Sequence, residues 1–82
     1  MTQDILANIV GLLGSALVVG AYGYSNLART MDFRLFNGLN LAGALLLIAS
    51  LTVHFNLAAM TLEVVWAIIA TLGLARAMRK GA

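Results

Sequence analysis

A single glutamate interrupts a long apolar segment near the carboxyl end of the sequence. Residues 61–76 read TLEVVWAIIATLGLAR, and Glu63 is the one acidic residue among them. Carboxyl groups can carry protons or bind cations, and acids inside a membrane often mark ion pathways. Two interpretations stay open. Glu63 is either a structural acid that fixes helix register through hydrogen bonds, or a proton- or cation-linked site.

Three asparagines, the one histidine and the one tryptophan are the other candidates. Asparagine in an apolar helix either bonds to a neighbouring helix or lines a polar pathway. The histidine is either a solvated or capping residue at a membrane edge or a proton sensor, since imidazole changes charge between about pH 5 and 8. The tryptophan either anchors at the interface or packs against a helix. We treat these side chains as one polar intramembrane cluster: Glu63, Asn8, Asn37, Asn40, His54 and Trp66.

Enzymatic patterns are absent from the sequence. It contains no HExxH, no GxSxG, no glycine-rich phosphate loop before a helix and no cysteine. One histidine and three acidic residues do not form a metal site of ordinary spacing within one chain. We therefore expect no enzyme activity, no cofactor and no metal.

The composition indicates lipid as the solvent. Of the 82 residues, 62% are hydrophobic and 10% are charged, whereas soluble domains are about 45–50% apolar and about 25% charged. A soluble chain this short has too much surface to hide so much apolar material. The net charge of +2 is small and no basic patch alternates with aromatic residues, so nucleic acid is not an expected partner.

Three apolar runs predict three transmembrane helices, at roughly 4–24, 33–53 and 57–75. Each has about the 20 residues needed to cross a hydrocarbon core about 30 Å thick. Asp32 and Asn56 precede the second and third runs as candidate N-caps. Short connections require neighbouring helices to be antiparallel. The sequence thus predicts an all-α, integral membrane three-helix bundle that forms one domain over residues 1–82.

The cationic residues predict the orientation. They flank the first connection or follow the third run, and these two regions lie on one side of a three-span chain: Arg29, Arg34, Arg76, Arg79 and Lys80. The positive-inside bias then places the N-terminus outside and the C-terminus in the cytoplasm. The first run lacks a preceding basic residue and carries Asp4, which is not typical of a cleaved signal peptide.

Small residues predict where the helices pack. Ala7, Gly11 and Ser15 recur every four residues in the first run, a pattern that lets helix backbones approach closely. Each run has one face that is too polar or too small to prefer lipid. We expect these three faces to pack together, with a second copy or a larger membrane complex as the further partner.

The stretches LFNGLNLAGALLLIASL (35–51) and EVVWAIIATLGLAR (63–76) carry a resemblance to known proteins. With the Ala21-Tyr22 pair, the Asn37, Asn40 and Gly43 spacing and the Glu63 and Trp66 pair, the chain resembles a family of small, three-span, uncharacterised bacterial membrane proteins, often labelled permease-like. The resemblance covers about residues 8–76. It implies a multi-pass protein of the bacterial inner membrane and brings no established activity.

A looser similarity is to half-sized sugar transporters of the SWEET type, which are three-span chains that dimerise. Those proteins carry a Pro-Gln pair in their first helix, whereas this chain has no proline. The similarity therefore implies only the architecture of a three-helix half. Two functions follow as hypotheses. The chain is a homo-oligomeric transporter half whose polar helix faces line a pathway, or it is an accessory subunit of a larger membrane complex.

Overall fold

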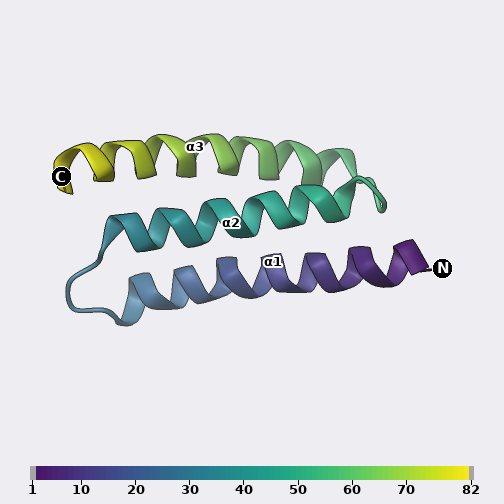
Figure 1. Cartoon of the computed structure of the whole chain (residues 1–82), viewed down its shortest axis with the longest axis horizontal. Coiled ribbons are helices and arrows are strands. Elements are labelled where there is room, and N and C mark those ends of the chain that lie inside the picture. Colours follow the sequence, from purple (N-terminus) through teal and green to yellow (C-terminus); the bar gives the residue numbers. More distant parts are fainter. Residues whose placement is uncertain (1, 82) are drawn as a thin grey trace.

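The computed structural model describes residues 2–81, which form three helices in chain order (Figure 1). They are α1 (Thr2–Leu27), α2 (Phe33–Leu51) and α3 (Leu57–Gly81). All three are long and apolar enough to cross a membrane. The all-α class is thereby confirmed, and each of the three predicted apolar runs forms a helix of sufficient length and hydropathy to span a membrane.

The helix limits differ from the predicted spans in ways that local hydrogen bonds explain. The two predicted caps are confirmed: Asp32 accepts from the backbone N–H of the second α2 residue at 2.9 Å, and Asn56 accepts from the N–H of Ala59 at 3.0 Å. α2 ends at Leu51 and not at residue 53, because the N–H groups of Val53 and His54 both turn back to the Ser50 carbonyl. α1 and α3 run past their predicted apolar ends, since polar residues outside a membrane core continue a helix readily.

A seam of small residues joins α1 to α2. The buried α1 residues are Ala7, Gly14 and Ala21, spaced by seven, a repeat that keeps one helix face against its neighbour. Gly14 faces Gly43 of α2, and a Cβ atom added to Gly14 would lie 2.7 Å from the Gly43 carbonyl oxygen. The two backbones are therefore in direct contact at this crossing.

α2 is the central helix and contacts both neighbours, whereas α1 and α3 do not contact each other within the described residues (Figure 1). The expected meeting of three faces around one core is thus not what the chain adopts. The buried apolar side chains are small: Ala7, Ala21, Ala44 and Ala70. Most large apolar side chains remain exposed. This outward-facing apolar surface fits lipid, where close contact of small residues associates helices.

Candidate functional site

Glu63 lies on the stripe of α3 that packs against α2. It precedes the buried Ala70 by seven residues, and it is itself only partly exposed. It is the seventh residue of α3, about 9 Å along the axis from the first residue. Its Oε1 atom is buried and has no hydrogen-bond partner among residues 2–81. A buried acceptor without a partner has lost its hydrogen bonds to water and has formed none within the protein, which costs free energy in an apolar medium.

Asn40 and Trp66 join α2 to α3. The Trp66 indole Nε1 donates to Asn40 Oδ1 at 3.2 Å, and Asn40 Nδ2 donates to the Phe36 carbonyl at 3.0 Å. Asn40 is 4% exposed, so both ends of its amide are satisfied inside the protein. Of the two interpretations left open for this asparagine, the geometry favours the interhelical hydrogen bond over the lining of a pathway.

Asn37 lies closer to the start of α2, against Gly73 of α3. Its Nδ2 donates to the Phe33 carbonyl at 2.9 Å. A Cβ atom on Gly73 would lie 2.5 Å from Asn37 Oδ1, so the absent side chain makes room for the amide. Phe33, Asn37 and Gly73 also line a hollow at this end of the molecule.

Asn8 is exposed on α1 beside the α1–α2 seam. It lines a shallow hollow of about 380 Å³ with Ser15 on α1 and Ser50 on α2. Asn8, Ser15 and Tyr22 repeat every seven residues, and all three are exposed. They form a polar stripe that runs alongside the seam and that α2 does not cover.

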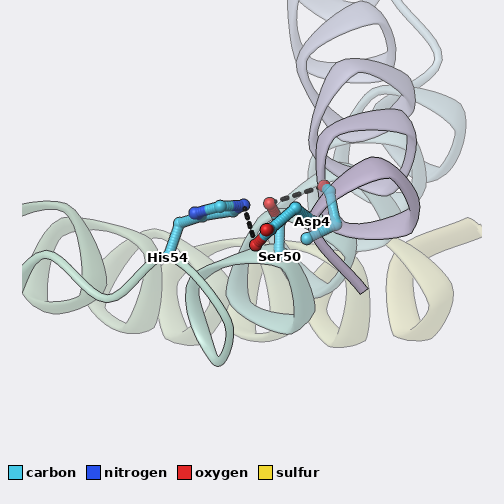
Figure 2. Close-up of polar contacts among 4 residues, drawn as sticks. Asp4, Ser50 and His54 are labelled. Atoms are coloured by element: carbon cyan, nitrogen blue, oxygen red, sulfur yellow. Dashed lines mark hydrogen bonds and ion pairs between the residues drawn. The ribbon is translucent and has the colours of Figure 1, made fainter. Parts of the chain in front are cut away.

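Two polar contacts tie the N-terminal part of α1 to the end of α2, and Figure 2 shows both. Ser50 Oγ donates to the Ala7 carbonyl at 2.7 Å. His54 Nε2 lies 3.5 Å from Asp4 Oδ1, and both side chains are about half exposed. His54 thus occupies the turn after α2, close to an acid of α1, and lies outside the helices.

The predicted cluster is therefore divided. Asn40 and Trp66 contact each other, and His54 contacts α1. Asn8 and Glu63 lie on α1 and α3, which do not touch, so one chain does not bring them together. Nor do Asn8 and Glu63 share one level along the long axis: each is the seventh residue of its helix, but α1 begins farther toward that end of the molecule than α3 does (Figure 1).

The arginines lie at the opposite end. Arg29 is in the first connection, Arg34 in the first turn of α2, and Arg76 and Arg79 in the last turns of α3. All four are exposed and share the end of the molecule that holds the α1–α2 connection and the C-terminus (Figure 1). The Lys80 side chain lies outside the described residues. No group of three or more histidine, aspartate or glutamate residues gathers as metal ligands in the described chain.

Two contacts were missed by sequence reasoning. The first is the Gly14–Gly43 crossing, which the spacing of seven through Ala7, Gly14 and Ala21 could have predicted. The predicted packing face instead rested on the spacing of four through Ala7, Gly11 and Ser15. The Asp4–His54 pair joins residues 50 positions apart, and no local pattern reports such a contact.

A sequence model of an uncharacterised protein family matches residues 7–81. No curated protein and no solved structure matches the chain. Because the match covers nearly the whole sequence, the chain belongs to that family. The predicted family resemblance is confirmed at this level, while the permease-like label and the likeness to half-sized sugar transporters stay predictions.

Proposed function

We propose that this chain is one half of a homo-oligomeric membrane transporter, coupled to a proton or a small monovalent cation through Glu63. The observation that carries the proposal is the buried Glu63 Oε1 atom without a hydrogen-bond partner. A proton or a cation on this carboxyl group removes the cost of burying its charge. Ionisable residues in transmembrane segments commonly serve in such relays.

A second copy supplies what one chain lacks. α1 and α3 contact only α2, and the polar stripe of Asn8, Ser15 and Tyr22 is uncovered. These groups are unfavourable against lipid, and a two-fold axis along the membrane normal would let two such faces cover each other. In such a dimer, Asn8 and Glu63 of the two copies would lie in the half of the pathway where α1 and α3 begin. Asn40 is already bonded to Trp66, so the pathway in this proposal is lined by Asn8 and Glu63, with Asn37 nearer the other end.

The setting we propose is the bacterial inner membrane, crossed three times, with the C-terminus in the cytoplasm. The gathering of Arg29, Arg34, Arg76 and Arg79 at one end supports this orientation, because cationic residues accumulate on the cytoplasmic side of membrane proteins.

An accessory subunit is the alternative function. Its support is that polar groups of α2 already bond within the chain: Asn40 bonds to Trp66, and Ser50 bonds to α1. In that case the uncovered faces of α1 and α3 dock to a different membrane protein, and the chain alone moves nothing.

The test combines assembly with flux. Protein extracted gently from its membrane is analysed by native mass spectrometry, and purified protein in vesicles with an internal pH dye is challenged with pH and sodium gradients. The transporter half predicts a homo-oligomer whose cation flux is abolished by Glu63→Gln while helical content is unchanged. Thr71→Val is the matched control, because Thr71 is exposed on α3 and bonds only to its own helix at the Ala67 carbonyl.

Two results would contradict the transporter proposal. The first is a homo-oligomer in which Glu63→Gln and wild type carry equal flux. The second is a monomer that co-purifies with a different membrane protein and carries no flux, a result that favours the accessory subunit.

A further inference from the structure

The cationic end of the molecule contains two adjoining hollows along α3, and the first of them also borders α2. One, of about 350 Å³, is lined by Phe33, Asn37, Gly73, Arg76 and Ala77. The other, of about 330 Å³, is lined by Leu72, Gly73, Arg76 and Arg79. Gly73 and Arg76 line both. Both hollows therefore adjoin Gly73 and are bordered by Arg76.

An apolar groove continues from these hollows toward the middle of the helices. It has a volume of about 300 Å³ and shares Leu72 with the second hollow. Its main apolar walls are Leu41, Leu45 and Ile48 of α2 with Val64, Ile68 and Leu72 of α3. On α3 these positions and Arg76 recur every four residues, so they follow one face of the helix.

The length of the groove matches one lipid tail. From Val64 to Leu72 the helix rises about 12 Å, and one leaflet of the hydrocarbon core is about 15 Å thick, half of the whole. An acyl chain that begins at the level of the arginines would therefore lie along the groove to near the middle of the membrane.

The charge at the head of the groove is not compensated by the protein. Within residues 2–81, the guanidinium groups of Arg34, Arg76 and Arg79 form no ion pair. The acid at this end, Asp32, accepts instead from the backbone N–H groups that begin α2. Arginine donors in a fork suit the oxygens of a phosphate group, and the Asn37 amide lies beside them.

We propose that the α2–α3 groove binds an anionic phospholipid. Its phosphate contacts Arg76 and Arg79, and one acyl chain lies along Leu72, Ile68 and Leu45. The occupant is a lipid and not free phosphate because the cationic hollow opens into an apolar groove that a phosphate ion would leave empty. Basic pockets between transmembrane helices are a known form of headgroup recognition.

The experiment is native mass spectrometry of the full chain released from nanodiscs that contain equal amounts of phosphatidylglycerol and phosphatidylcholine. We expect the wild type to retain phosphatidylglycerol in preference. The Arg76→Gln, Arg79→Gln double variant should lower that retention by about 25-fold, about fivefold for each guanidinium group removed. Arg29→Gln is the control, since it removes one exposed arginine at the same end that lines neither of the two hollows.

A second variant tests the groove itself. Thr71 is exposed and borders the groove, so the larger side chain of Thr71→Phe should occupy part of it. We expect this variant to lose bound phosphatidylglycerol with its arginines intact. Circular dichroism verifies that each variant keeps its helical content.

Three outcomes would overturn the proposal. Equal retention of the two lipids would remove the headgroup preference. An equal loss in Arg29→Gln would show general attraction to charge. Retention unaffected by Thr71→Phe, with inorganic phosphate displacing the lipid, would show an anion site without an acyl-chain groove. Because none of these variants alters Glu63, cation flux can persist when lipid binding fails, and the reverse also holds.

Discussion

Replacing Glu63 by methionine should stabilise the protein. Methionine has a similar length and flexibility and no charge. The carboxyl oxygen that it removes is buried without a hydrogen-bond partner in the described chain. Removing a buried acceptor that lacks a partner returns the desolvation cost that folding imposed on it. The substitution thus separates an unsatisfied carboxyl group from one that holds the helices in register.

The expected gain is about 1–3 kcal/mol, the cost of one buried and unsatisfied polar group. Asn40→Leu is the opposite case, because that amide is 4% exposed and bonded at both ends. Interhelical hydrogen bonds in membrane proteins contribute about 0.6 kcal/mol on average and at most about 1.7 kcal/mol. The two variants should therefore shift the free energy of unfolding in opposite directions.

The assay is equilibrium unfolding in mixed micelles with a rising fraction of sodium dodecyl sulfate. The single tryptophan, Trp66, packs at the α2–α3 contact, so its fluorescence follows the separation of these helices. We expect a higher midpoint for Glu63→Met and a lower midpoint for Asn40→Leu. A lower midpoint for Glu63→Met would refute the reasoning, because it would mean that the carboxyl group has a stabilising partner in the folded chain.

Four further substitutions, one of them a control, test the contacts of α1 by the same unfolding assay. Gly14→Ala should cost about 1–3 kcal/mol, as overpacked sites do, because the new Cβ atom would lie 2.7 Å from the Gly43 carbonyl oxygen. Gly20→Ala has open space within 4 Å and should be neutral or stabilising, so equal effects of these two substitutions would contradict the tight crossing. Ser50→Ala should cost about 0.6–1.7 kcal/mol by removing an interhelical hydrogen bond of 2.7 Å, and no midpoint shift would contradict that contact. His54→Gln should cost at most about 1 kcal/mol, since the contact of His54 with Asp4 at 3.5 Å is about half exposed, and a larger loss would contradict this weak contact.

The fold could be predicted from the sequence where the need for backbone hydrogen bonds dominates. A long apolar run in lipid must form a helix, so composition and length alone predicted all three helices. The N-caps Asp32 and Asn56 could be predicted because capping depends on residues that are neighbours in the chain. The helix ends were harder to place: α3 continues beyond residue 75 through Arg76 and Arg79, where hydropathy falls but helix propensity does not.

The contacts of the candidate site were harder to predict from the sequence, because they join different helices. Asn40 is paired with Trp66 since α2 lies beside α3, and the same sequence pattern would have allowed it to line a pathway. Glu63 and Asn8 were expected to belong to one polar cluster. Their contact requires α1 to touch α3, and the order of packing around α2 prevents this. Apolar periodicity gives the buried face of a helix and not the identity of the helix that covers it.

Position 63 of α3 is occupied by glutamate, although the packing of α3 on α2 favours a small residue there. Its stripe on α3 continues with alanine at positions 70 and 77, and Ala70 is almost fully buried, so packing on α2 favours a small side chain here. A carboxyl group at the first of these positions leaves one buried oxygen without a hydrogen-bond partner in the described chain. Contact with α2 therefore does not account for a glutamate at this position. The remaining sources of favourable interaction are an ion that binds the carboxyl group and a partner outside the chain, and these are the two functions under test. A Glu63→Met protein with a higher unfolding midpoint and no flux would indicate that Glu63 binds the ion. A Glu63→Met protein with a higher midpoint that no longer assembles would indicate that Glu63 contacts the partner.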